Sequence, residues 1–217
     1  MSTTVRSGPG GVRGGGRHRL LAGLIYGSMC ALAIVLAWAR GVSVVRMEAA
    51  VPVLDSSLAS VFLGAALAAM TIVSTRVLVV RTAWARRLRE DFRALLADAG
   101  TRDVAWLALT SGVGEELLFR GALLPWWGLG LSSLAFGALH VGPARRFLPW
   151  TLWATFMGAL FGAIYFATGH LEGCVLAHVL VNFVNLRFVL AFDGRLDLAE
   201  ARPGEQALVS SRRVRRD

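Results

Sequence analysis

The sequence contains no lysine and very little cysteine. All 23 basic residues are arginine, which is consistent with a GC-rich genome and a bacterial source. The only two cysteines, Cys30 and Cys174, lie within apolar stretches, so they offer no disulfide framework. We interpret them as small buried hydrophobic residues, and they indicate nothing about the redox compartment.

Polar residues are also scarce. Hydrophobic residues make up 55% of the 217 positions and the mean hydropathy is +0.58, whereas a soluble domain of this size has a more balanced apolar content. The net charge of +9 could indicate nucleic-acid binding, but the arginines cluster at the edges of apolar runs, where they would meet lipid headgroups. We therefore expect a membrane protein whose partner is the bilayer, with no nucleic-acid partner.

Apolar runs long enough to cross a bilayer recur along the chain. About 20 helical residues span the hydrocarbon core of roughly 30 Å. We predict an all-α, multi-pass transmembrane helical bundle with about six spans. These cover residues 20–39, 56–75, 104–128, 129–144, 147–168 and 173–192. After the second span, the Arg- and Leu-rich segment 76–93 is typical of an interfacial amphipathic helix.

The same pattern predicts the domain organisation. Residues 1–19 are rich in Gly, Ser and Arg and cannot bury enough surface to fold, so they form a disordered basic cytoplasmic arm. The segment 20–103 holds two spans and the interfacial helix. A core follows from 104 to 192, and 193–217 is a polar basic tail.

Arginine distribution predicts the orientation, because cytoplasmic loops collect basic residues. Alternate connections are basic, and the intervening ones are nearly neutral or balanced by acids. Both termini should therefore be cytoplasmic. The basic connections contain Arg13, Arg17 and Arg19; Arg76 to Arg93; Arg145 and Arg146; and Arg212, Arg213, Arg215 and Arg216.

Three charged residues interrupt the predicted third span: Glu115, Glu116 and Arg120. An ionised side chain at the bilayer centre costs about 2.5 to 3.5 kcal/mol on insertion scales, so these residues must face protein, water or one another. Glu116 and Arg120 have the i, i+4 spacing of a favourable helical ion pair. Glu115 lies about 100° around the helix and has a different role.

Two further spans carry polar residues on one face. Phe136 and His140 lie one turn apart in the fourth span, as do His178 and Asn182 in the sixth. Each alone is better explained as a satisfied core group or as interhelical glue. Together on three helices they favour a functional site.

These motifs resemble those of the CAAX-protease and bacteriocin-processing (CPBP) intramembrane peptidases, which include the type II CAAX prenyl endopeptidases. The family's EExxxR corresponds to Glu115, Glu116 and Arg120, its FxxxH to Phe136 and His140, and its HxxxN to His178 and Asn182. Three complete motifs in order form a specific signal. The resemblance covers residues 104–192 and implies a peptidase core there.

The resemblance implies a glutamate-based, metal-free peptidase acting on a peptide or protein near the membrane. Glu115 would be the general base, with His140 orienting the water. His178 and Asn182 would donate hydrogen bonds to the oxyanion. Glu116 and Arg120 would support the helix. We expect no cofactor.

Three alternatives stay open. A Glu and two His could supply the ligands of a catalytic zinc, with Cys174 one turn before His178 as a further candidate, although the sequence lacks HExxH and Asn182 is a poor zinc ligand. A proton-coupled transporter could use intramembrane Glu and His, but no inverted repeat is visible. A non-catalytic scaffold should have lost a motif residue, and none is lost.

Overall fold

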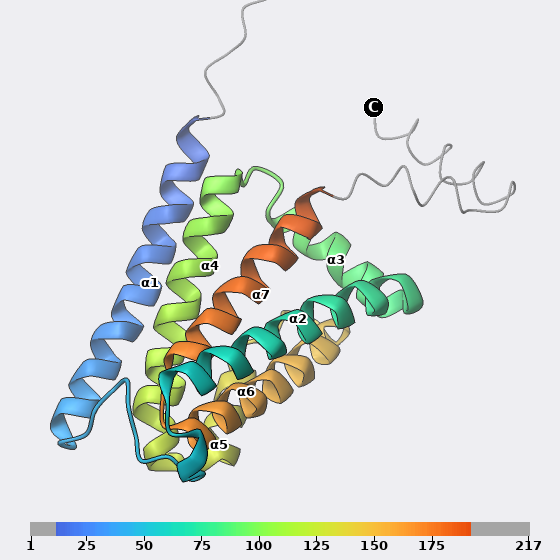
Figure 1. Cartoon of the computed structure of the whole chain (residues 1–217). Helices are drawn as coiled ribbons and strands as arrows, with labels where there is room; N and C mark the ends of the chain where they lie inside the picture. Colours follow the sequence, from blue (N-terminus) through green and yellow to red (C-terminus); the bar gives the residue numbers. More distant parts are fainter. Residues whose placement is uncertain (1–11, 192–217) are drawn as a thin grey trace, which may run out of the picture.

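The computed structural model describes residues 12–191, which fold as a bundle of helices (Figure 1). The long helices are α1 (Val12–Ala39), α2 (Ser57–Arg81), α3 (Ala83–Leu95), α4 (Thr101–Glu116), α5 (Leu124–Ala138), α6 (Leu148–Thr168) and α7 (Glu172–Ala191). A π-helix, η2 (Leu117–Leu123), joins α4 to α5, and two short 3-10 helices are η1 (Pro52–Leu54) and η3 (Arg145–Phe147).

The expected all-α membrane bundle is confirmed. Within residues 12–191, four helical segments are long and apolar enough to cross a membrane: Arg19–Ala39, Ser57–Arg81, Arg145–Thr168 and Glu172–Ala191. They correspond to the first, second, fifth and sixth predicted spans. Many of their large apolar side chains are exposed on the protein surface, as lipid-facing residues are.

The boundary predicted between the third and fourth spans coincides with a break in the helix, and the helix after this break is shorter than the predicted span. α4, η2 and the start of α5 make one helical run that breaks at Gly128, where φ is 73° and ψ is 174°. This backbone conformation is open essentially to glycine alone. Beyond it, α5 ends at Ala138, short of the predicted end at Ala144. The part of α5 after Gly128 therefore rises only about 15 Å, half the thickness of the hydrocarbon core.

The N-terminal end of α1 also differs from the prediction. The helix begins at Val12, so the last part of the predicted arm, 12–19, is helical. Extending an existing helix costs much less than nucleating one, so a Gly- and Arg-rich flank can continue a strongly apolar helix. Residues 1–11 of the predicted arm and the predicted tail 193–217 lie outside the described residues.

The amphipathic segment forms α3, which begins at Ala83 because Thr82 caps it: the Thr82 side chain accepts a hydrogen bond from the backbone N–H of Ala85. The helix contacts η3. The Arg146 guanidinium pairs with Asp91 at 3.0 Å, and the rings of Phe92 and Trp150 meet edge to face. α3 thus lies beside the connection that follows His140.

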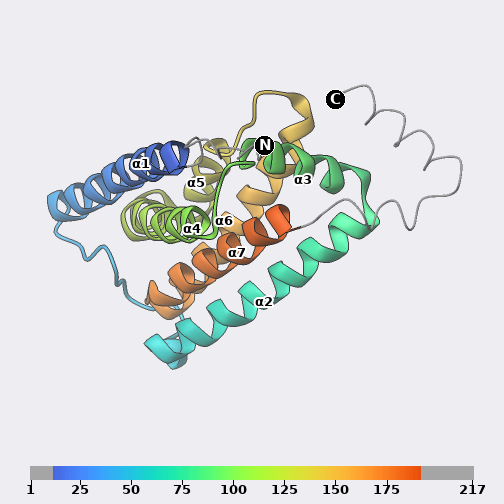
Figure 2. The same cartoon turned by 90° about the horizontal axis from the view of Figure 1, so that it is seen from above.

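The helices are arranged so that α4 lies in the interior. Viewed from above, α1, α4, α7 and α2 follow one another in a row, and α5 and α6 pack behind them (Figure 2). α4 therefore contacts α1 on one side and α7 on the other. Glu115 and Glu116 of α4 and Arg120 of η2 are buried, surrounded by protein rather than by lipid.

The connection between α1 and α2, residues 40–56, crosses the end of the bundle where α6 turns into α7. The buried ring of His170 holds it there: Nε2 lies 3.0 Å from Asp55 Oδ1, and Nδ1 lies 3.0 Å from Ser57 Oγ. The backbone N–H of Met47 donates to the carbonyl of Gly169. This polar network fixes the end of the bundle opposite α3.

Candidate active site

The acidic pair of α4 is buried, and its second member is the centre of a charged network. Glu116 Oε1 accepts hydrogen bonds from Arg120 Nη1 at 2.8 Å and from His178 Nδ1 at 2.7 Å. Glu116 and Arg120 are almost fully buried. Buried charges are tolerated when they are paired, and Oε1 of Glu116 has two such partners, whereas its buried Oε2 has none within residues 12–191.

Arg120 satisfies its other contacts on α5 and α6. Its Nη2 donates to the carbonyl oxygen of Gly158 at 3.1 Å. Its guanidinium carbon lies 4.3 Å from the ring centroid of Phe136 and 5.3 Å from that of Phe161. Such cation–π contacts are strongest when the cation is removed from water. Arg120 therefore links the acidic pair to α5, through Phe136, and to α6, through Gly158 and Phe161.

Glu115 lies between the two histidines. Its Oε2 atom is 3.7 Å from His178 Nε2 and 4.0 Å from His140 Nε2. Within residues 12–191 this buried oxygen has no hydrogen-bond partner. Both separations are longer than a direct hydrogen bond. They are suited to one small polar group that contacts all three atoms.

The two imidazoles are oriented by their other nitrogens. His140 Nδ1 lies 2.8 Å from the carbonyl oxygen of Phe136, and a carbonyl can only accept, so Nδ1 carries the proton. His178 Nδ1 faces the carboxylate of Glu116 in the same way. In the neutral rings Nε2 is therefore an acceptor, and both Nε2 atoms face Glu115.

The π-helix after Glu116 is a feature that the sequence does not predict. η2 contains Arg120 and follows the acidic pair directly. Helical turns with i→i+5 hydrogen bonds are rare in proteins, and those that do occur are frequently found at functional sites. The ion pair between Glu116 and Arg120 nevertheless forms as its i, i+4 spacing predicts.

Asn182 makes its contact one turn away from Glu115. Its amide nitrogen donates to Ser111 Oγ at 3.0 Å, and Ser111 lies one turn before Glu115 on α4. Sequence reasoning missed Ser111. A serine in an apolar helix is common and inexpensive, so its only signal is its i, i+4 spacing from Glu115.

Tyr26 is a second residue that sequence reasoning missed. It lies on α1, and its phenol is close enough to Glu115 to interact with it electrostatically. A tyrosine hydroxyl within an apolar span needs a polar partner, which is a weak signal because the partner cannot be identified from sequence. The site thus extends onto α1.

A catalytic zinc is one of the alternatives that the sequence left open. A zinc site needs at least three ligands around one point. Among the residues that the structure describes, no group of three His, Cys, Asp or Glu side chains could hold a metal. Cys174, the further candidate ligand, lies in the apolar core and its thiol donates to the carbonyl oxygen of Phe161 at 3.1 Å.

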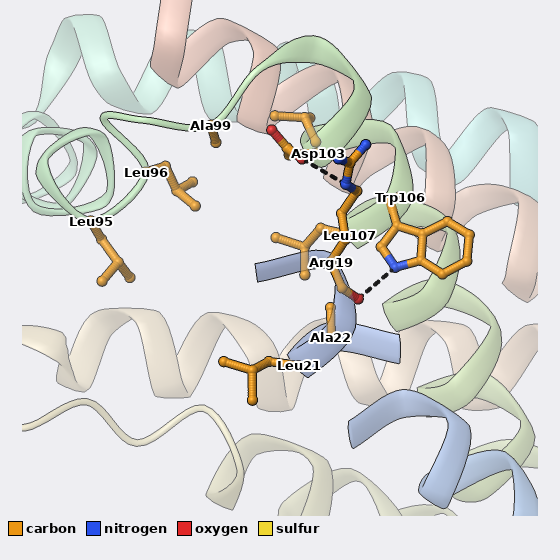
Figure 3. Close-up of a pocket in the computed structure, with 10 residues that line it drawn as sticks. Arg19, Leu21, Ala22, Leu95, Leu96, Ala99, Asp103, Trp106 and Leu107 are labelled. Atoms are coloured by element: carbon orange, nitrogen blue, oxygen red, sulfur yellow. Dashed lines mark hydrogen bonds and ion pairs between the residues drawn. The ribbon is translucent and has the colours of Figure 1, made fainter. Parts of the chain in front are cut away.

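A cavity of about 240 Å³ lies elsewhere, between α1, α4 and the connection from α3 to α4 (Figure 3). Arg19 and Asp103 form an ion pair at 3.2 Å on its wall, and the Trp106 indole donates to the carbonyl of Arg19. The remaining lining is mainly apolar, and no residue of the Glu115 cluster contributes to it. This cavity is separate from the polar site.

The comparisons with known families agree with the motifs. The family described as type II CAAX prenyl endopeptidase Rce1-like matches residues 100–184. That segment, which holds Glu115, His140, His178 and Asn182, matches a family of membrane endopeptidases. No curated protein and no solved structure matches the chain significantly.

Proposed function

We propose that this protein is an intramembrane endopeptidase in which Glu115 activates a water molecule to attack a peptide bond. The observation that supports this most directly is the convergence of Glu115 Oε2 with Nε2 of His178 and Nε2 of His140, at 3.7 and 4.0 Å. A water between these atoms can donate to the carboxylate and to an imidazole, so its oxygen lone pair is directed away toward a substrate.

In the first step Glu115 takes a proton from this water as its oxygen bonds to the scissile carbonyl carbon. The carbonyl π electrons move onto oxygen and form a tetrahedral oxyanion. Asn182 is the proposed donor to that oxyanion. His178 can be a second donor only as an imidazolium, because its Nδ1 proton is already directed at Glu116.

In the second step the oxyanion collapses, the C–N bond breaks, and protonated Glu115 donates its proton to the leaving amine. The carboxylate is thereby regenerated and no net proton is consumed within the site. Glu116 and Arg120 touch neither water nor substrate in this scheme. They hold His178 and the surrounding helices in place.

The proposal includes a metal-free site, a peptide or protein substrate near the membrane, and a cell-membrane location with both termini in the cytoplasm. The first point is consistent with the described residues, which contain no group of three or more His, Cys, Asp or Glu side chains that could hold a metal ion. Arg19 and the arginines of α3 and η3 belong to three of the predicted basic connections, which supports the cytoplasmic location of both termini.

Comparative membrane proteomics tests the function even while the substrate is unidentified. Cells in which the protein is replaced by Glu115→Gln should accumulate uncleaved precursors of one or more membrane-associated proteins. The variant should insert at normal levels, because Gln has the shape of Glu. Identical proteomes for wild type and variant would show that the proposed activity is wrong.

A further inference from the structure

Two antiparallel rows of polar side chains meet between α4 and α7. Glu115 faces His178, and one turn away Ser111 faces Asn182. The helices can approach this closely because position 112 is glycine: a Cβ there would lie 2.6 Å from Val179 Cγ2 and 3.1 Å from its backbone nitrogen. Along the interface between α4 and α7, the pair of Ser111 and Asn182 thus lies one helical turn from the pair of Glu115 and His178.

The hydrogen bonds of Ser111 determine the orientation of the Asn182 amide. The Ser111 hydroxyl donates its one proton to the carbonyl oxygen of Ala108 at 3.4 Å. It can then only accept from Asn182, so the NH₂ group rather than the carbonyl of the amide must face it. The second N–H of this NH₂ group is not used by Ser111.

We propose that Ser111 is a positioning residue of the peptidase reaction. It holds the Asn182 amide with the NH₂ group in a fixed direction, so that the second N–H is available to the oxyanion. This inference rests on the proposed function and extends it to a residue outside the three motifs. Ser111 does not itself contact the substrate, and it acts only through Asn182.

A double-mutant cycle tests this role. The probe is an internally quenched peptide that spans the cleavage site of the precursor accumulating most in Glu115→Gln cells, assayed with purified protein in proteoliposomes. Removing an oxyanion donor lowers kcat roughly 10²- to 10³-fold, so we expect a loss of kcat in this range for Asn182→Ala. Ser111→Ala should lower kcat about tenfold with KM within about twofold, because only orientation is lost. In the Asn182→Ala background, Ser111→Ala should have no further effect.

Ser60→Ala is the matched control. Ser60 is also buried, and its hydroxyl also bridges two parts of the bundle, donating to the carbonyl of His170 and accepting from the backbone of Gly173. Both variants lose a buried hydroxyl and should lower the unfolding temperature. Only Ser111→Ala should lower kcat.

Three results would overturn the inference. One is an unchanged kcat in Ser111→Ala, and another is the same fractional loss with and without Asn182. In both cases Glu115→Gln would remain inactive, so the peptidase function would stand. The third is normal precursor processing by Glu115→Gln cells, which would remove the proposed function and the role of Ser111 with it.

Discussion

His178 Nδ1 lies 2.7 Å from Glu116 Oε1, so the second acidic residue of α4 holds the ring of α7. The same oxygen also binds Arg120. Glu116 thereby does more than pair with a residue on its own helical run, which was all that the i, i+4 spacing could predict. A carboxylate at one imidazole nitrogen fixes the ring orientation and the direction of the other nitrogen.

Glu116→Gln should therefore damage both activity and stability. The amide cannot replace the charge that balances Arg120, and removing one partner of a buried ion pair costs about 3 to 5 kcal/mol. We also expect kcat to fall at least about tenfold, because His178 loses its anchor. Thermal unfolding in detergent and cleavage of the precursor peptide measure the two effects.

The double variant Glu116→Gln, Arg120→Gln separates the two effects. It removes the unpaired buried charge, so part of the lost stability should return. Activity should stay low, since His178 is still not held by a carboxylate. Recovery of activity together with stability would argue against an orienting role for Glu116.

His140→Ala should abolish cleavage and leave the helices folded. The ring is partly exposed and its Nε2 faces Glu115, so its loss removes a group that contacts the reacting water. General acid–base groups contribute typically 10²- to 10⁴-fold, and we expect a loss in kcat of that order. Peptide cleavage by purified protein, compared at equal amounts of folded protein, measures it.

His170→Ala is the control for this variant. The His170 ring also contacts a carboxylate, that of Asp55, but it lies in the network that holds the 40–56 connection. The unfolding temperature should fall while kcat per folded molecule stays within about threefold. A loss of kcat as large as that of His140→Ala would place His170 in the reaction instead.

Most of the fold could be predicted because apolar run length and charge position are local properties of the sequence. The boundary predicted between residues 128 and 129 coincides with the observed break at Gly128, whereas α5 ends at Ala138, short of the predicted end at Ala144. An apolar run indicates where a span can lie but not where its helix ends, because helix ends depend on capping and packing.

The charged part of the candidate site was visible for a similar reason. Glu115, Glu116 and Arg120 are expensive in lipid, so they draw attention even when their partners are unknown. Ser111 and Tyr26 carry no such cost. Their roles arise from contacts with residues far away in the sequence, namely Asn182 and Glu115, which only the packing of α4 with α7 and α1 brings together.

Gly128→Ala should destabilise the protein, because its φ of 73° and ψ of 174° fall in a region that costs about 1 to 3 kcal/mol for other residues. Gly130→Ala is the matched control. A Cβ meets no atom within 4 Å at either position, but only Gly128 has a positive φ. Gly130→Ala should be neutral or stabilising by up to about 1 kcal/mol, because alanine favours helix. Equal unfolding temperatures for the two variants would contradict the assigned strain.

The metal-free proposal predicts full activity without zinc. Purified active protein should contain far less than one zinc per chain by elemental analysis. Turnover should persist after dialysis against a strong chelator, since the proposed water is activated by Glu115 and His140 without a metal. Stoichiometric zinc, with chelator-sensitive activity restored by added zinc, would replace the proposed mechanism with a zinc-dependent one.

The orientation in the membrane can be tested with two single cysteines placed at opposite ends of the bundle. Val53, in the 40–56 connection, and Leu95, at the end of α3, are both highly exposed, at 88% and 76%. With Cys30 and Cys174 changed to Ser, a membrane-impermeant maleimide should label Val53→Cys in intact cells and Leu95→Cys only after permeabilisation. The reason is that α3 lies beside the basic connections, which the positive-inside rule assigns to the cytoplasm. The reverse labelling pattern would invert the topology and move both termini to the outer side.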